Sequence, residues 1–108
     1  MNINPGELKK KIAIIQWEKI KDEDGFEKKV IKSKKSVWAK FQRKSMKELE
    51  ENFANFRDIE VRFLIRYTEI DRDMEIEYNG ELYQIIFLNN YGDNNRYIEI
   101  GARIKDNG

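Results

Sequence analysis

Cysteine and histidine are both absent from this chain of 108 residues. Without cysteine the protein has no disulfide, no thiolate nucleophile and no zinc–sulfur centre. Without histidine it lacks the most frequent general base and the most frequent ligand of transition metals. Catalysis that depends on either residue is therefore excluded, and we expect neither a cofactor nor a bound metal ion.

Long apolar runs are missing as well. No stretch approaches the roughly 20 apolar residues that a membrane-spanning helix needs. The N-terminal "MNINPGELKKK" has its lysines after a polar start and lacks the apolar stretch of a signal peptide. We therefore expect no membrane partner, and a protein that is made in the cytoplasm and stays there or in a structure assembled there.

Apolar residues are in modest supply for a chain of this length. Hydrophobic residues make up 40% of the sequence and charged residues 38%, whereas about 25% charged residues is usual. Two separate cores would each be too small to bury enough apolar surface. We predict one domain spanning residues 1–108, with a small interior and a large surface that neighbouring subunits could partly cover.

The net charge of +1 conceals an uneven distribution. Residues 1–47 carry 14 basic and 6 acidic side chains, a net charge of +8, and residues 48–108 carry 7 basic and 14 acidic ones, a net charge of −7. Between Lys28 and Lys47 there are nine basic residues and no acidic one. This run is either a solvated face or a site for an anionic partner, which could be nucleic acid or the acidic half of another copy.

Apolar and polar residues alternate along most of the chain, which is typical of β-strands. In "MEIEYNGELYQIIFL" (74–88) the alternation breaks at Asn79-Gly80, a pair that tolerates the positive φ angles of a two-residue hairpin turn. Together these patterns predict a mainly β fold, a small six-stranded β-barrel. The extended runs are 8–20, 28–44, 59–67, 74–88 and 96–105, and the turns between runs are 21–27, 68–73 and 89–95.

One segment has a helical period instead. Ser45 with Glu48 three residues later forms a capping box, in which the two side chains satisfy the first free amides of a helix. The apolar residues at helical spacing are Met46, Leu49, Phe53 and Phe56. We predict one short helix or loop, a flexible insert of about residues 43–57, between the second and third strands.

No pattern in the chain assembles an obvious catalytic or ligand site. The acidic residues are scattered over strands and turns, where they favour solubility. The "DEDG" of residues 22–25 lacks the ligand spacing and terminal glutamate of a calcium loop, so an acidic turn is the better interpretation. Some aromatic side chains could stack on single-stranded bases, but their alternation favours core or subunit contacts. These are Trp17, Trp38, Tyr67, Tyr78, Tyr83 and Tyr97.

The order of several short motifs nevertheless resembles a known family. "NPGELKKKIAIIQ", "D-x-x-G", "VWAKFQ", "IRYTEIDRDMEIEYNGELYQI" and "NNRYIEIGARIK" occur in that order, with the helical insert after the third. The chain is similar to the head–tail joining proteins of tailed bacteriophages, also called head-completion, head-closure or stopper proteins. The residues that carry the resemblance are Leu8, Ile12 and Ile14; Trp38 and Ala39; Ile65, Arg66, Tyr67 and Ile70; and Tyr78, Gly80, Tyr83 and Ile85.

The resemblance implies a non-enzymatic β-barrel that forms a twelvefold ring at the virion neck, under the portal and adaptor rings. Such a ring closes the channel over packaged double-stranded DNA and offers the docking face for the tail. The implied partners are the portal-adaptor protein, the tail-terminal protein and other copies of the chain, and the protein would be synthesised in the cytoplasm of the bacterial host. The family's acidic or cysteine-containing C-terminal tail is absent here, and the basic run 28–47 is denser than usual.

In this family the segment between strands two and three projects toward the axis and gates the channel, which maps here onto Arg43–Arg57. The residues implied to face the channel are Arg43, Lys44, Ser45, Lys47, Glu48, Glu50, Glu51 and Asn52. The residues implied to contact subunits or partners are Lys32, Lys34, Lys35, Trp38, Phe53 and Phe56. An alternative role for the helix is to cover one open end of the barrel.

Two other functions fit the same sequence. A free-standing nucleic-acid-binding barrel would be a monomer that uses the lysines of residues 28–47 on phosphates, with an affinity that falls steeply with salt. A tail-completion ring protein of similar size and fold is the other alternative, and an enzyme ranks below both.

Overall fold

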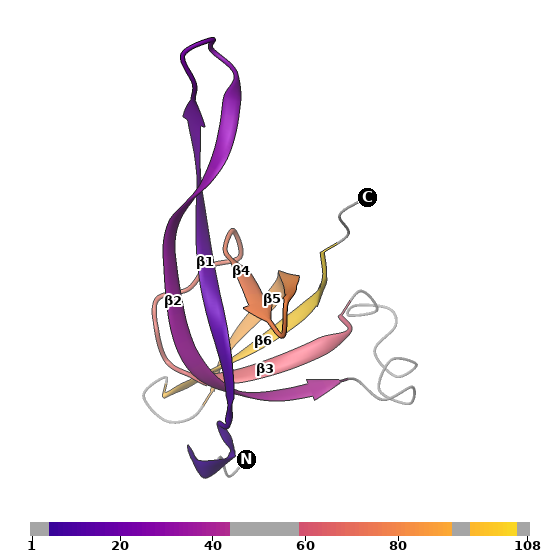
Figure 1. Ribbon diagram of the computed structural model, residues 1–108. Coiled ribbons are helices and arrows are strands. Elements are labelled where there is room, and N and C mark those ends of the chain that lie inside the picture. The colour runs from indigo at the N-terminus through magenta and orange to yellow at the C-terminus, as the bar shows by residue number, and fades with distance from the viewer. Residues whose placement is uncertain (1–4, 44–58, 92–95, 106–108) are drawn as a thin grey trace.

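The computed structural model describes residues 5–43, 59–91 and 96–105, in which six strands form a closed antiparallel barrel (Figure 1). The order of neighbouring strands is β1-β2-β3-β6-β5-β4. The elements are η1 (Pro5–Glu7, a 3-10 helix), β1 (Lys10–Lys21), β2 (Glu27–Arg43), β3 (Val61–Arg66), β4 (Glu75–Tyr78), β5 (Glu81–Tyr91) and β6 (Tyr97–Ile104). Within the described ranges, no helix has the length and apolarity of a membrane span.

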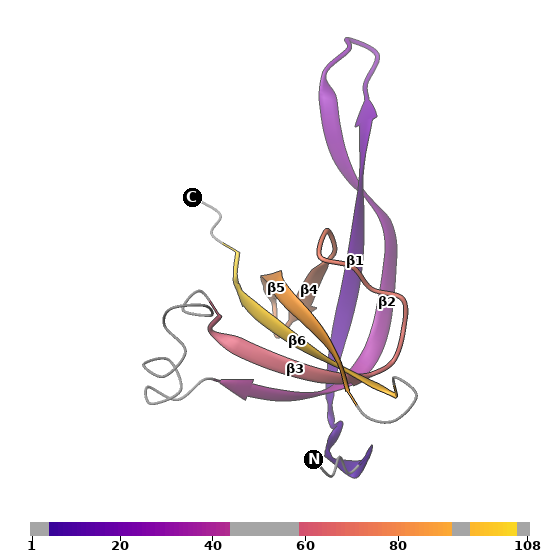
Figure 2. The same ribbon diagram turned by 180° about the vertical axis from the view of Figure 1, so that it is seen from behind.

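The predicted mainly β fold and its six-stranded barrel are confirmed. The short helix predicted between the second and third strands falls on residues 44–58, outside the described residues. In Figure 2, β3, β6 and β5 face the viewer, and the end of β2 runs beside β3.

The core is formed by the alternate residues that point into the barrel from every strand. Phe63 is 0% exposed, and its ring lies 5.3 Å from that of Phe41, 5.5 Å from that of Tyr83 and 5.8 Å from that of Tyr78. The 2.0-residue period of a strand is what brings these side chains together on one face. The buried cluster comprises Ile12, Ile14, Ala39, Val61, Phe63, Ile65, Ile76, Tyr83, Ile85, Ile98, Ile100 and Ala102.

The hairpin of β4 and β5 turns at the two residues that its sequence predicts. Asn79 has a φ of 54° and Gly80 a φ of 82°, the positive values that a tight hairpin turn requires. Ile76 lies opposite Tyr83 across this hairpin, so both apolar side chains enter the core together. The predicted turn is confirmed.

The loop predicted over residues 89–95 begins later than expected. β5 continues to Tyr91, with Asn89 opposite Glu99 and Asn90 opposite Ile98. Asparagine is a poor strand former, but β6 supplies backbone partners at these positions, and tertiary pairing outweighs a weak local preference. The predicted loop was therefore wrong for residues 89–91, which belong to β5.

Candidate functional site

A two-stranded ribbon stands away from the barrel, and we name residues 17–31 the arm (Figures 1 and 2). β1 pairs with β4 only over Ala13–Ile15, and β2 pairs with β3 only over Ala39–Arg43. Beyond these pairs, in the described part of the chain, β1 and β2 pair only with each other, as far as Lys21 and Glu27. The molecule is therefore elongated, 52 × 30 × 24 Å.

The end of the arm is an ordered acidic turn. The Asp22 carboxylate accepts hydrogen bonds from the backbone N–H groups of Asp24 (3.0 Å) and Phe26 (2.9 Å), and Gly25 has a positive φ of 83°. Residues 22–27, which we name the tip, hold four acidic side chains and no basic one. The prediction of an acidic turn at this position is confirmed.

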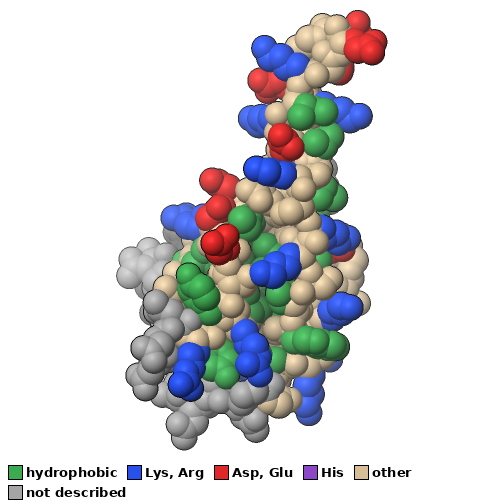
Figure 3. All heavy atoms as spheres, turned by 90° about the vertical axis from the view of Figure 1, so that its left-hand side faces the viewer, with side chains coloured by type: hydrophobic (Ala, Val, Ile, Leu, Met, Phe, Trp, Pro, Cys, Tyr) green, Lys and Arg blue, Asp and Glu red, His purple; other side chains and the backbone are tan. Residues whose placement is uncertain are grey.

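Apolar side chains are exposed along both faces of the arm. The pairing places Ile20 and Val30 on one face and Trp17 and Ile31 on the other, because alternate residues of a strand share a face. Ile20 is 41% exposed, Ile31 49% and Phe26, at the tip, 69%. Figure 3 shows apolar side chains among charged ones along the arm, with acidic side chains close to its tip. A two-stranded ribbon gains little stability by itself, so an exposed apolar ribbon of this kind indicates a contact surface.

The base of the arm is fixed to the barrel by a buried carboxylate. Glu75 on β4 is 7% exposed and accepts a hydrogen bond from the Trp17 indole N–H at the start of the arm. The Lys105 ammonium lies 2.8 Å from the other carboxylate oxygen of Glu75. The Lys29 ammonium lies 4.8 Å from the centre of the Trp17 ring, a cation–π contact. Two donors therefore satisfy the buried carboxylate and orient the arm.

Stability should be nearly independent of pH around neutrality and fall in alkali. Burial raises the pKa of the Tyr83 hydroxyl, and the hydrogen bond from Lys105 to Glu75 raises the pKa of the Lys105 ammonium. For both groups the stabilisation is complete below the unfolded-state pKa, about 10 or slightly above, and is lost as pH rises through the folded-state pKa. We expect urea unfolding to give nearly constant free energies from about pH 6 to 9, since the chain has no histidine. The free energy should decrease above about pH 10, and less steeply in Tyr83→Phe. A sharp loss of stability between pH 6 and 8 would contradict this.

A groove opens on the barrel where β2 and β3 part. The last pair between these strands is Ala39 with Ile65, and beyond it the residues before Ala39 diverge from those after Ile65. The resulting hollow has a volume of about 350 Å³. We name it the basic groove, because its lining contains two cationic side chains and no carboxylate. It is lined by Leu8, Lys35, Val37, Trp38, Arg66, Tyr67 and Thr68.

The polar and aromatic side chains of the basic groove are accessible to a partner. Trp38 is 57% exposed and Tyr67 54%. Lys35 and Arg66 are both exposed, and the Lys35 ammonium donates a hydrogen bond to the Thr68 hydroxyl. Large aromatic faces next to cations are typical of surfaces that bind another macromolecule.

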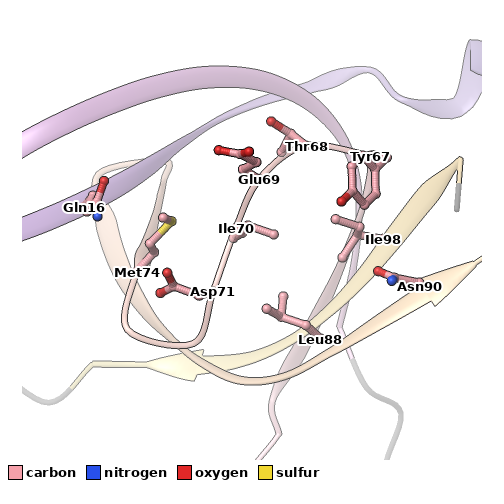
Figure 4. Close-up of a pocket in the computed structure, with 10 residues that line it drawn as sticks. All are labelled: Gln16, Tyr67, Thr68, Glu69, Ile70, Asp71, Met74, Leu88, Asn90 and Ile98. Carbon is pink, nitrogen blue, oxygen red and sulfur yellow. The ribbon is translucent and has the colours of Figure 1, made fainter.

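A second hollow of about 510 Å³ lies under the segment that joins β3 to β4 (Figure 4). Ile70, Leu88 and Ile98 point toward its centre, while the carboxylates of Glu69 and Asp71 turn away from them. The remaining lining residues are Gln16, Tyr67, Thr68, Asn90 and Met74. An apolar centre of this kind suits the side chain of a partner better than acid–base chemistry, which needs facing titratable groups.

The structure separates the four described interface residues predicted from sequence. Lys35 and Trp38 meet in the basic groove, whereas Lys34 lies in another hollow, 3.1 Å from the Glu77 carboxylate. Lys32 is exposed beside the irregularity in the pairing of β1 with β2. Of the predicted channel residues, Arg43 is the last residue of β2 and is exposed. The others lie outside the described residues, as do both predicted phenylalanines of the interface: Lys44, Ser45, Lys47, Glu48, Glu50, Glu51, Asn52, Phe53 and Phe56.

The arm is the feature that the sequence reasoning missed. The two extended runs at the start of the chain were predicted as strands of the barrel, with no part standing outside it. Their length was the available signal. β1 has 12 residues and β2 has 17, whereas their barrel neighbours β4 and β3 have 4 and 6. Strands that outrun their neighbours must project or pair elsewhere.

A closed antiparallel barrel with a projecting ribbon and exposed apolar and charged surfaces is suited to contacts with other proteins. The chain belongs to the phage head completion protein family, whose model matches residues 3–105. The family resemblance seen in the sequence is thereby confirmed. The protein is a structural component of the phage head.

Solved structures share the fold. The chain is similar to the solution structure of protein SF1141 from Shigella flexneri 2a, with a TM-score of 0.75 and 22% identity over 98% of this chain and 100% of that one. A chain from the virion of a native gene transfer agent particle matches with a TM-score of 0.57 and 13% identity, over 88% of this chain and 92% of that one. At these identities the similarity concerns the fold alone. No curated protein matches the sequence.

Proposed function

We propose that this protein forms a ring at the virion neck, under the portal and adaptor rings, that closes the DNA channel after packaging and docks the tail. Membership of the head completion family over nearly the whole chain supports this role. The observation that carries the proposal is the arm, whose apolar side chains a single copy leaves exposed. A subunit of a closed ring needs two different surfaces, one for each neighbour. The arm and the basic groove are two such surfaces. We propose in addition that the ring has twelvefold symmetry and that it contacts the portal-adaptor protein on one side and the tail-terminal protein on the other.

The proposed gate is the segment 43–57, with the channel-facing residues named in the sequence analysis. Its attachment to the barrel favours this role. Arg43 at the end of β2 lies opposite Val61 at the start of β3, so the chain leaves and re-enters the barrel at neighbouring positions. An insert joined in this way can be exchanged at a small cost, because closure entropy changes only slowly with loop length.

Replacing Met46–Asn55 by a short Gly/Ser linker tests the gate. We expect the variant to keep a cooperative unfolding transition and to bind capsids, since its barrel residues are unchanged. Capsids that carry it should lose packaged DNA, because nothing then occludes the channel. The measurement is the amount of nuclease-resistant DNA per capsid, compared with capsids that carry the wild-type protein.

The control leaves segment 43–57 unchanged and carries Lys10→Gln with Arg72→Gln, two exposed positions outside the arm and the basic groove. These capsids should retain their DNA. Full DNA retention in capsids with a folded, docked linker variant would rule out the gate. Unfolding of the linker variant would instead show that the insert covers the barrel.

One observation favours a second candidate, a nucleic-acid-binding barrel. Trp38 and Tyr67 are exposed beside Lys35 and Arg66, an arrangement on which single-stranded bases stack. This candidate requires a monomer whose affinity for single-stranded DNA falls steeply with salt. Light scattering of the protein alone and on capsids, together with DNA titrations at two salt concentrations, separates the two functions.

A further inference from the structure

We propose that the tip of the arm of one copy docks in the basic groove of the next copy, so that the subunits join head to tail. This inference rests on the proposed ring and names the two surfaces that would close it. The tip consists of residues 22–27, and the groove is centred on Lys35, Trp38, Arg66 and Tyr67.

The tip and the groove of one chain are too far apart to meet. Glu27 at the tip and Trp38 in the groove lie on the same strand, β2. At about 3.3 Å per residue, the strand between them spans roughly 35 Å. The base of the arm is fixed through Trp17 and Glu75, so the ribbon is directed away from the barrel. A contact between these surfaces must therefore join two copies.

The two surfaces are complementary in charge. Glu23 and Asp24 are exposed at the tip, whose residues 22–27 include four acidic side chains and no basic one. The basic groove offers Lys35 and Arg66, and its lining has no carboxylate. Partly exposed ion pairs add little affinity each, but complementary charges fix the register and accelerate encounter.

The two surfaces are also complementary in their apolar parts. Phe26 is 69% exposed at the tip, and nothing in the ordered turn covers it. Trp38 and Tyr67 are more than half exposed at the groove. Burying aromatic side chains against one another supplies most of the energy of a typical protein contact, and aromatic pairs add to it through ring geometry. A bare phosphate or a nucleic acid strand would match the cations of the groove and leave Phe26 of the tip uncovered.

The geometry of this contact sets the form of the assembly. The tip and the groove are different surfaces, so each copy can use one surface for each neighbour. Used in this way the contact is heterologous and generates a ring where the rotation closes, whereas a reciprocal exchange of tips between two copies would close a dimer. A self-complementary contact of two tips or two grooves would end at two copies.

The absence of cysteine allows a direct test by disulfide crosslinking. A full-length chain carrying Glu23→Cys at the tip and Thr68→Cys at the groove retains Phe26, Trp38 and both groove cations. Oxidised capsids carrying this variant should give a ladder of crosslinked species, from dimers to large oligomers, on a non-reducing gel. The matched control carries Glu23→Cys and Gln84→Cys, whose second site is an exposed position of β5 away from the groove. It should give no species above the dimer.

Charge reversal provides an independent test in the same full-length chain. Glu23→Lys with Asp24→Lys at the tip, or Lys35→Glu with Arg66→Glu at the groove, should each raise the concentration for half-maximal assembly at least tenfold. All four substitutions in one chain restore opposite charges across the contact and should recover most of the assembly. Lys10→Glu with Arg72→Glu, at exposed positions outside the arm and the groove lining, changes the net charge as the groove variant does and should assemble normally. Circular dichroism checks that each variant is folded.

The outcomes separate this inference from the proposed ring. Rings that form on capsids without a crosslinked ladder, and that tolerate both charge reversals, overturn the docking of the tip and leave the ring standing. A groove variant that loses affinity for DNA but assembles normally also overturns it. If no assembly occurs in solution or on capsids, the ring fails and this inference fails with it.

Discussion

Replacing Phe63 by alanine is expected to lower the free energy of unfolding by about 3–5 kcal/mol. Phe63 is fully buried, and its ring contacts the rings of Phe41, Tyr78 and Tyr83. Removing the ring loses its burial and leaves a cavity among rings that are held by three different strands and cannot all move inward. The total stability of a domain is typically about 5–15 kcal/mol, so this single change removes a large part of it. Urea unfolding followed by circular dichroism measures the difference.

Phe26→Ala is the matched control, since it removes the same ring from a side chain that is 69% exposed. We expect its free energy of unfolding to change by no more than about 0.5 kcal/mol. The two variants should therefore differ in what they lose. Phe63→Ala should reduce the folded population, whereas Phe26→Ala should stay folded and assemble less well. Equal destabilisation by the two substitutions would contradict the assignment of Phe63 to the core and Phe26 to a contact surface.

Replacing Gly101 by alanine should lower the free energy of unfolding by about 1–3 kcal/mol, because the site has no room for an added methyl group. An added Cβ would overlap the ring of Phe87 and lie 3.1 Å from the Cδ1 atom of Ile59. Gly101 is buried on β6 and lies opposite Phe87 where the register of β5 shifts by one residue. The irregular strand thus places an aromatic ring directly over a residue without a side chain.

A double-mutant cycle with Phe87→Ala checks the cause. In that background the methyl group no longer meets a ring, so Gly101→Ala should cost clearly less than in the wild type. Gly80→Ala is the control: no atom lies within 4 Å of its added Cβ, but its φ of 82° strains an L-residue. Its cost, about 1 kcal/mol, should be the same with and without Phe87. Additive effects of Gly101→Ala and Phe87→Ala would show that the ring is not the obstacle.

Most of the barrel could be predicted from the sequence because its causes are local. The alternation of apolar and polar residues is enough to place Val61, Phe63 and Ile65 on one face of a strand. Asn79-Gly80 is enough to place a hairpin turn, since the required φ angles depend on those two residues alone. The acidic turn at 22–25 follows in the same way from Asp22 and Gly25, and the order of motifs is enough to indicate the family.

The sequence by itself therefore determined most of the strands, the turns at 22–25 and 79–80, many inward-facing residues and the family. Only the tertiary structure decided at which residue each strand stops pairing with the strand beside it. β1 and β2 have partners on their outer edges for only a few residues, and this turns their remaining length into an arm. The parting of β2 from β3 likewise creates the groove that joins Lys35 and Trp38 to Arg66 and Tyr67. The physical reason is that the alternation of a strand depends on its own residues. The length over which it is paired depends on a partner strand that is far away in the sequence.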